Sequence, residues 1–383
     1  MLNKIIYFLD LIVPKKKRIV FSSFPDLSDN AFALFNFMKS NNKLNSYSFV
    51  WLTEQNPYKY NKYLKNERIK VVKKNSFIGM YFYLSAKVAF YTHGLYNDVT
   101  SYNKKKKINL WHGMPFKKIG ALDDNFKGIL PVQDRFIVTS KKCAEIYSKS
   151  FKISKKNILS LGQARNDLLK EKTNFFEKKS IQISKYKKVV AWLPTYRKSS
   201  FGDIREDGFY NCNKIGFLEI EMLVKLDGFL VEKNFFLIIK LHPMDILNDD
   251  VFKKLRNISL IRNKDLEENE EQLYPILGMT DALITDYSSV FIDYLLLNKP
   301  IAFDLNDFDE YNKNRGFLFK EPKKNLTGNY IYNYEDLVVF LNEVLHEEDK
   351  FEKERNKIKE LYHKYDNFDS SKRITDWMLN ELI

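Results

Sequence analysis

The feature that most constrains the fold of this chain is an alternation of short β-rich runs with helix-like stretches. In the first half, the runs expected to be strands are rich in β-branched and aromatic residues and occupy 18–22, 47–52, 69–72, 87–92, 108–111 and 135–139. Helix-like stretches, such as 30–39 and 76–86, lie between them. Strands that alternate with helices form parallel sheets with right-handed crossovers. The first half therefore predicts a Rossmann-like α/β domain.

The same pattern begins again after Asp167, with strands expected at 188–193, 235–241, 259–262, 281–285 and 300–304. The polar segment 168–188 lacks a strand pattern and is interpreted as the connection between two domains. We therefore predict an N-terminal domain over 1–170 and a C-terminal domain over 171–383, facing each other across a cleft. The charged tail 334–383 is expected to be helical and to pack back across the assembly.

Composition limits the classes of partner. The 383 residues carry a formal net charge of +14, which favours an anionic partner: nucleic acid, an acidic membrane surface or a phosphate-bearing substrate. Only two cysteines occur, Cys143 and Cys212. They form neither a disulfide framework nor a zinc pattern, and they fit a reducing cytoplasm.

Residues 1–18 combine a short apolar run with the basic cluster 15–18. The run is too short to span a bilayer, and its basic residues follow it, an order unlike that of a secretory signal. Two interpretations stay open. The segment is a peripheral, membrane-associating amphipathic helix, or it is an ordinary first helix packed on the N-terminal domain.

Polar residues gather where strands end, which is where open parallel sheets bind ligands. The segment 281–293 has the sequence DALITDYSSVFID, in which an apolar strand runs into a helix start. A helix N-terminus and serine hydroxyls favour a phosphate site, although serine and aspartate also cap helices without any ligand. The candidates are Thr285, Asp286, Ser288, Ser289 and Asp293.

A second strand end carries Lys240, Leu241, His242 and Pro243. Lys240 and His242 share one side of an extended chain, where a cation and an imidazole would bind phosphates. Without an anion, a buried pair of this kind would leave polar groups uncompensated. A structural histidine in a turn is the alternative.

In the first half, His112 and Gly113 follow a strand directly, and Lys117 adds positive charge nearby. Gly113 lets a substrate approach the imidazole, and a neutral histidine accepts a hydroxyl proton. A second strand-end histidine, His93, is a candidate to line the same crevice.

Three further segments carry arginines whose planar fork suits phosphate. They read GQARND, LPTYR and NRG, and each arginine is equally compatible with a structural ion pair. The substrate-binding candidates in them are Arg165, Thr195, Arg197, Arg315 and Gly316.

In this order, six motifs closely resemble the CDP-glycerol glycerophosphotransferase family: WHGMPFKK, GQARND, WLPTYR, KLHP, TDYSSVFIDY and NKPIAFDLNDFDEYNKNRG. The resemblance covers residues 18 to 320. The family contains teichoic-acid primases and polymerases and capsule polymerases that use CDP-glycerol or CDP-ribitol. It implies a GT-B-like fold. One departure is Gln163–Ala164–Arg165, where members commonly carry a proline before the arginine.

The resemblance also implies roles for single residues. His112 is expected to be the base on the acceptor side, and His242 the donor-side histidine at the pyrophosphate. Thr285, Ser288 and Ser289 match the phosphate-binding segment, which Asp286 and Asp293 organise; Arg197 and Arg315 match positions near the donor.

The implied reaction transfers glycerol phosphate or ribitol phosphate from a CDP-polyol to a lipid-linked or polymeric acceptor at the cytoplasmic face of the membrane, releasing CMP. No carboxylate cluster is built for a tightly held metal, so any Mg²⁺ is expected to bind loosely. The alternatives are a GT-B glycosyltransferase using a nucleotide sugar and a non-catalytic binder of anions or nucleic acid. Basic residues spread through the chain, rather than interleaved with aromatics, argue against nucleic acid. The sequence leaves the oligomeric state, the choice of polyol and the number of units added open.

Overall fold

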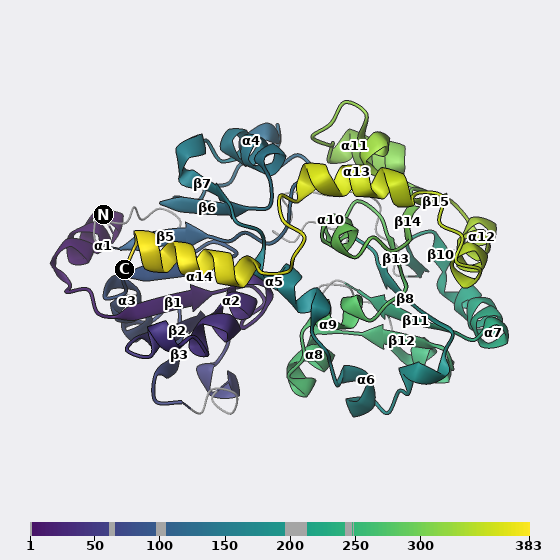
Figure 1. The fold of residues 1–383 in the computed structure, drawn as a ribbon, viewed down its shortest axis with the longest axis horizontal. Coiled ribbons are helices and arrows are strands. Elements are labelled where there is room, and N and C mark those ends of the chain that lie inside the picture. The colour runs from purple at the N-terminus through teal and green to yellow at the C-terminus, as the bar shows by residue number, and fades with distance from the viewer. Residues whose placement is uncertain (1, 61–65, 97–104, 196–212, 242–246, 248) are drawn as a thin grey trace. The chain divides into compact units, whose positions relative to one another are not determined.

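The computed structural model describes residues 2–60, 66–96, 105–195, 213–241, 247 and 249–383, and it divides into two compact units (Figure 1). Unit 1 contains Met1–Met114, Ile119–Lys170 and Tyr362–Ile383, and unit 2 contains Pro115–Lys118 and Glu171–Leu361. The expected division near residue 170 agrees with this. Two segments lie otherwise than expected: 115–118 belongs to unit 2, and 362–383, assigned from the sequence to the C-terminal domain, belongs to unit 1.

Unit 1 is built on a seven-stranded parallel sheet with strand order β3-β2-β1-β4-β5-β6-β7. Its strands are β1 (Arg18–Ser22), β2 (Ser48–Thr53), β3 (Ile69–Lys73), β4 (Val88–Tyr91), β5 (Lys106–Asn109), β6 (Arg135–Val138) and β7 (Ile158–Ser160). Its α-helices are α1 (Leu2–Ile12), α2 (Asp29–Lys39), α3 (Phe77–Leu84), α4 (Lys141–Ser150), α5 (Ala164–Asp167) and α14 (Ser370–Glu381). The central strands β1, β2 and β4 are almost entirely buried, as expected for apolar strands covered on both faces.

Asp167 holds helix α14 onto unit 1. The Asp167 carboxylate accepts hydrogen bonds from the backbone N–H groups of Ser370 (2.8 Å) and Ser371 (2.7 Å), at the start of the helix. A carboxylate at this position satisfies free N–H groups and is stabilised by the helix dipole. These contacts explain why the end of the chain belongs to unit 1.

Unit 2 is built on a six-stranded parallel sheet with strand order β12-β11-β8-β13-β14-β15. Its strands are β8 (Lys188–Leu193), β11 (Phe235–Lys240), β12 (Ile258–Ile261), β13 (Ala282–Thr285), β14 (Ile301–Asp304) and β15 (Asn329–Ile331), and a separate hairpin pairs β9 (Lys214–Ile215) with β10 (Leu218–Glu219). The α-helices are α6 (Phe175–Lys178), α7 (Leu223–Lys233), α8 (Asn263–Asn269), α9 (Leu273–Gly278), α10 (Val290–Tyr294), α11 (Phe308–Asn314), α12 (Tyr334–Leu345) and α13 (Glu352–Tyr362), the last ending at the boundary with unit 1.

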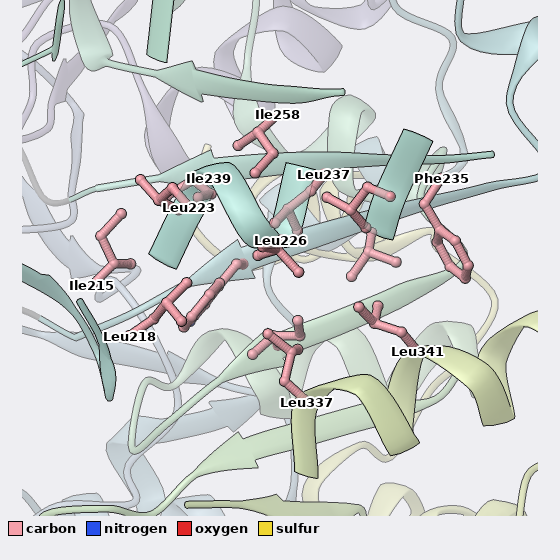
Figure 2. Close-up of a cluster of buried hydrophobic side chains, with 14 of the residues drawn as sticks. Ile215, Leu218, Leu223, Leu226, Phe235, Leu237, Ile239, Ile258, Leu337 and Leu341 are labelled. Atoms are coloured by element: carbon pink, nitrogen blue, oxygen red, sulfur yellow. The ribbon is translucent and has the colours of Figure 1, made fainter. Parts of the chain in front are cut away.

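The main core of unit 2 lies between one face of this sheet and the helices α7 and α12 (Figure 2). Leu223 and Leu226 come from α7, Leu337 and Leu341 from α12, and all four are buried. Each such side chain stabilises the fold by about 1.5–3 kcal/mol when fully removed from water.

The parallel α/β architecture predicted for both halves is confirmed, and so is the helical tail, which contains α12, α13 and α14. The edge strands β7 and β15 were missed because three residues each give too short a pattern. The strand expected at 108–111 is β5, which ends earlier, at Asn109. Trp111 adopts a positive φ of 55°, which no strand tolerates. No helix in the described part of the chain is both long enough and apolar enough to span a bilayer.

Candidate active site

Two histidines follow neighbouring strands of unit 1. His93 comes after β4 and His112 after β5, and these strands pair in register, so both residues lie at one edge of the sheet. Their rings are stacked, with centroids 4.1 Å apart and an interplanar angle of 8°. The positive φ of Trp111 makes the turn after β5, and the Trp111 ring stacks on His112 as well, at 4.2 Å. The imidazole of His112 is therefore held between two flat rings.

The proton on His112 has a defined place. Its Nδ1 lies 3.3 Å from the carbonyl oxygen of Thr92, which can only accept a hydrogen bond. Nδ1 therefore carries the hydrogen, and the lone pair is on Nε2. Burial lowers the pKa of His112, and it lowers the pKa of His93 well below its usual value, with the charge of His112 as a second cause. Both imidazoles are therefore neutral at pH 7, as a general base requires.

A network of largely buried hydrogen bonds fixes the loop that carries Trp111 and His112. Arg165 Nη1 contacts Asp29 Oδ1 at 2.8 Å and the carbonyl oxygen of His112 at 2.9 Å. Asn30 donates from Nδ2 to the Trp111 carbonyl at 3.0 Å and accepts from the Arg165 backbone N–H at 3.0 Å. Arg165, for which a substrate contact and an ion pair were both open, forms the ion pair. Its direct binding of substrate stays a prediction. We call His93, His112, Asp29, Asn30 and Arg165 the histidine site.

In unit 2, four neighbouring strands, β11, β8, β13 and β14, end at the same edge of the sheet. Asp286, directly after β13, accepts hydrogen bonds from the Thr195 backbone N–H (2.8 Å) and from its hydroxyl. The Thr285 hydroxyl donates to the Leu193 carbonyl at 2.7 Å. The loops after β8 and β13 are thus tied together by buried polar contacts.

The serines come next in this segment. Ser288 donates its backbone N–H to Asp286 at 3.2 Å, and its hydroxyl accepts from Val290 at 3.4 Å. Ser289 is the N-cap residue of α10, yet its side chain makes no capping bond. Asp293 is buried and accepts a hydrogen bond from Tyr274 at 2.6 Å, and its role in organising a phosphate site stays a prediction. Both serines are half-buried.

Lys240 ends β11, the strand on the other side of β8 from β13, and is buried. Its Nζ donates to the Leu241 carbonyl at 2.8 Å, and Arg262 adds a second positive charge. Burial, followed by the charge of Arg262, lowers the pKa of Lys240 to about 8. A buried cation of this kind is stabilised by an anionic ligand. We call Thr195, Lys240, Thr285, Asp286 and Ser288 the strand-end site.

The motif that contains His112 is divided between the units. Gly113 stays in unit 1 and accepts a hydrogen bond from Tyr147 through its carbonyl, whereas Lys117 belongs to unit 2. There, Lys117 forms an antiparallel bridge with Phe317, and Lys118 donates its backbone N–H to Gly316 at 3.1 Å. Gly316 has a φ of 73°, and a Cβ atom there would lie 3.1 Å from the Lys118 side chain. Both observations explain why a glycine occupies this position.

Arg315 ends helix α11, next to this pairing, and its side chain is half-buried. Three predicted site residues, Arg197, His242 and Pro243, lie outside the described residues. In the described part of the chain, no group of three or more His, Cys, Asp or Glu side chains is arranged to hold a metal ion.

The sequence patterns did not predict Asp29 and Asn30 as site residues. Both follow β1, which pairs with β4 inside the unit 1 sheet, at the edge where His93 and His112 lie. Their sequence, Ser-Asp-Asn before an apolar helix, was indistinguishable from an ordinary helix start. Their position after a strand was the one signal that could have selected them.

Two units with parallel sheets and polar strand ends are typical of the GT-B-like transferases. A wall teichoic acid polymerase, TagF, has this fold in common with the chain, with a TM-score of 0.77 and 21% identity over 99% of this chain and 93% of that one. This likeness confirms the predicted GT-B-like fold class.

A family model described as CDP-glycerol:poly(glycerophosphate) glycerophosphotransferase matches residues 5–380, and the chain belongs to this family. A teichoic acid poly(glycerol phosphate) polymerase of Bacillus spizizenii is 25% identical, over 97% of this chain and 94% of its own length. A teichoic acid ribitol-phosphate primase of the same organism is 27% identical, over 55% of this chain and 54% of its own length. The predicted family and enzyme class are confirmed.

Proposed function

We propose that this protein transfers glycerol phosphate or ribitol phosphate from a CDP-polyol to a hydroxyl of a lipid-linked or polymeric acceptor, a teichoic acid or a capsular polymer. The observation that carries the proposal is the state of His112. Its Nδ1 is engaged by the Thr92 carbonyl, and burial lowers its pKa, so Nε2 is a free-base acceptor for a hydroxyl proton.

The step conserves atoms and charge as follows. The acceptor oxygen attacks the phosphorus that bears the polyol, and a new P–O bond forms. The bond from this phosphorus to the bridging oxygen of the pyrophosphate breaks, and CMP leaves with that oxygen. His112 Nε2 takes the hydroxyl proton. Positioning and neutralisation of charge account for most of the catalysis in such transfers.

The strand-end site is proposed to bind the pyrophosphate of the donor. Lys240 supplies a buried positive charge, and the hydroxyls of Ser288 and Ser289 are available to phosphate oxygens. Thr195, Thr285 and Asp286 hold the two loops in place. His242, Arg197 and Pro243 are assigned to the donor by the family pattern, and Gly113, Arg165, Lys117, Arg315 and Gly316 complete the substrate-binding set.

In this proposal unit 1 presents the acceptor and unit 2 binds the donor. Because the acceptor is linked to lipid or to a growing polymer, we place the protein at the cytoplasmic face of the membrane, bound peripherally. Charge neutralisation comes from cationic side chains, so we expect turnover without a tightly bound metal.

The test is CMP release from CDP-glycerol and from CDP-ribitol in parallel, with a synthetic lipid-linked acceptor. UDP-sugars serve as control donors. Acceptor-dependent CMP release from one CDP-polyol, lost in His112→Asn, supports the proposal and identifies the polyol. Turnover of a UDP-sugar, with neither CDP-polyol used, overturns it.

A metal-depleted sample tests whether turnover needs a tightly bound metal ion. Protein dialysed against EDTA and assayed in metal-free buffer should keep most of its turnover, and added Mg²⁺ should change the rate only modestly. Complete loss of turnover, restored by stoichiometric Mg²⁺, contradicts the metal part of the proposal.

A further inference from the structure

An exposed phenylalanine, Phe24, lies beside the histidine site. Phe24 is the second residue after β1 and His93 the second after β4, and the last residues of these strands, Ser22 and Tyr91, are register partners. The Phe24 and His93 rings meet edge to face, with centroids 5.7 Å apart and planes at 71°. Phe24 is nevertheless 57% exposed. A single exposed apolar residue is ordinary on most surfaces, but this one lies at the sheet edge where parallel sheets bind ligands.

The Phe24 ring is close to the histidine that is proposed as the base. His93 stacks on His112 with centroids 4.1 Å apart, so one ring connects Phe24 to the His112 imidazole. The two centroid distances, 5.7 Å and 4.1 Å, together set the upper limit to the separation of Phe24 from His112. An acceptor built from several hydroxylated units can therefore reach His112 with its terminal hydroxyl and touch Phe24 with an adjacent part of the same molecule.

Hydrogen bonds on both sides of Phe24 hold the loop that carries it. The buried Ser23 donates its hydroxyl to the Pro25 carbonyl at 2.7 Å. The buried carboxylate of Asp26 accepts from the backbone N–H groups of the two residues after β2, at 3.0 Å and 2.9 Å. A side chain on a fixed loop loses less conformational entropy when it meets a ligand, and this favours binding.

The same loop leads directly into the residues that hold the His112 loop. Asp29 accepts a hydrogen bond from Arg165, which also donates to the His112 carbonyl. Asn30 donates to the carbonyl of the residue before His112 at 3.0 Å. The segment from Phe24 to Asn30 is therefore bonded to the loop that presents the imidazole, and it fixes the position of Phe24 relative to His112 within one unit.

Charged groups lie around this corner of the sheet. Lys74 pairs with Glu54 at 2.7 Å and donates to the carbonyl of Gly94, the residue after His93, at 2.9 Å. Glu54 is tied to the Phe24 loop by its backbone N–H, and its side chain is 44% exposed. Charged groups make poor neighbours for an acyl chain, but a carboxylate accepts hydrogen bonds from hydroxyls. The surroundings of Phe24 therefore fit a hydroxylated ligand better than a lipid tail.

We propose that Phe24 binds the acceptor, with its ring against the C–H groups of the polyol chain or sugar ring at the hydroxylated end of that molecule. These C–H groups are polarised by the neighbouring oxygens, so they complement the negative face of an aromatic ring. The contact positions the acceptor so that its terminal hydroxyl reaches His112. The inference rests on the reaction proposed above, and it assigns recognition of the acceptor to a named side chain.

Binding is measured by calorimetry with the full chain and without donor. The probes are two water-soluble acceptors, a poly(glycerol phosphate) oligomer and a sugar glycoside. Phe24→Ala should weaken the binding of at least one probe about fivefold to tenfold, and that probe identifies the contacted group, whereas Phe24→Tyr, which keeps the ring, should stay within about twofold. The control is Phe77→Ala, which removes a phenylalanine of the same unit that is 98% exposed on α3. Wild-type protein that binds neither probe, or Phe24→Ala that binds both as the wild type does, overturns the proposal.

Steady-state kinetics distinguish acceptor binding from a purely structural role. With a CDP-polyol as donor, Phe24→Ala should raise the acceptor KM about fivefold to tenfold, while kcat at saturating acceptor and the donor KM stay within about twofold. A fall in kcat with an unchanged acceptor KM contradicts the proposal, because it makes Phe24 a support for His93. A rise in KM confined to a lipid-linked acceptor contradicts it too, because it assigns the ring to the lipid.

The binding experiment needs no turnover, so its outcome is independent of the proposed reaction. Weaker probe binding by Phe24→Ala, together with no use of any CDP-polyol by the wild type, would retain the acceptor contact and reject the reaction. Turnover of a CDP-polyol with unchanged probe binding in Phe24→Ala would do the reverse. Circular dichroism and urea unfolding of Phe24→Ala should match the wild type, which shows that the variant is folded.

Discussion

His93 stacks on His112 with the ring centroids 4.1 Å apart and the planes 8° from parallel. Because the His93 pKa lies well below its usual value, this ring is neutral and acts through its flat surface. His93→Phe should keep the stack and hold kcat within about threefold of wild type, whereas His93→Ala should lower kcat about fivefold, the worth of one aromatic pair. Donor KM should be unchanged in both. Equal loss in the two variants contradicts a packing role.

His112 itself should act as a base. His112→Asn should lower kcat by about 100-fold or more while donor affinity, measured by calorimetry with CDP-glycerol, is retained. Since burial lowers the pKa of His112, the neutral form persists below pH 6.5, and the acid limb of the kcat/KM profile should fall below that value. His346→Asn, an exposed histidine at the end of α12, is the control. Loss of donor affinity in His112→Asn instead places the residue on the donor side.

The Asp29–Arg165 pair should stabilise unit 1 as well as position His112. Both side chains are largely buried, so Arg165→Ala leaves a carboxylate without its partner and should cost about 3 kcal/mol of unfolding free energy. Lys155→Ala, which removes an exposed pair with Glu145 at 4.0 Å, should cost less than about 0.5 kcal/mol. Urea denaturation of both variants measures the difference. Similar values for the two would contradict a buried, partnered role for Arg165.

Lys240 should make donor binding sensitive to pH. Its pKa of about 8 means that the free protein carries this charge below pH 8 and loses it above. Affinity for CDP-glycerol should therefore fall between pH 7 and pH 9. In Lys240→Met, affinity should be about tenfold weaker at pH 7 and almost independent of pH, whereas Lys240→Arg should keep tight binding at pH 9. Lys254→Met, an exposed lysine of the same unit, is the control, and a pH slope that persists in Lys240→Met contradicts the assignment.

Asp167, which holds helix α14, predicts a pH effect on stability. Burial raises the pKa of Asp167 to about 6, so the folded protein binds this proton more tightly than the unfolded chain does. The resulting stabilisation is complete below about pH 4 and is lost as pH rises through about 6. Relative to Asp167→Asn, the wild type should therefore be more stable at pH 4 than at pH 7, by about 2 kcal/mol in urea titrations. If the difference in unfolding free energy between the wild type and Asp167→Asn is the same at pH 4 and pH 7, this carboxyl does not titrate as expected.

Much of the strand-end site could be predicted from sequence because its residues follow apolar runs directly. Thr285 ends β13, Asp286 and Ser288 follow within three residues, and Lys240 ends β11. The unit to which each segment belongs was harder to predict from the sequence. Residues 115–118 and 362–383 join the other unit through contacts between residues far apart in the sequence, such as the bridge between Lys117 and Phe317 and the bonds from Asp167 to α14. Contacts between residues so distant in sequence leave no local pattern.

The sequence by itself determined the two parallel α/β units, the strand ends that carry polar residues, and the family, because periodicity and motif order are written locally along the chain. Only the tertiary structure decided which of these residues meet. It placed Asp29 and Asn30 behind His112, with Arg165 tied to the His112 carbonyl, and it stacked His93 against the imidazole. It also packed α1 against α3 at one end of unit 1 (Figure 1). The physical reason is that hydrogen bonds, ring stacking and burial depend on distances in space, which strand order and crossovers set and sequence spacing does not.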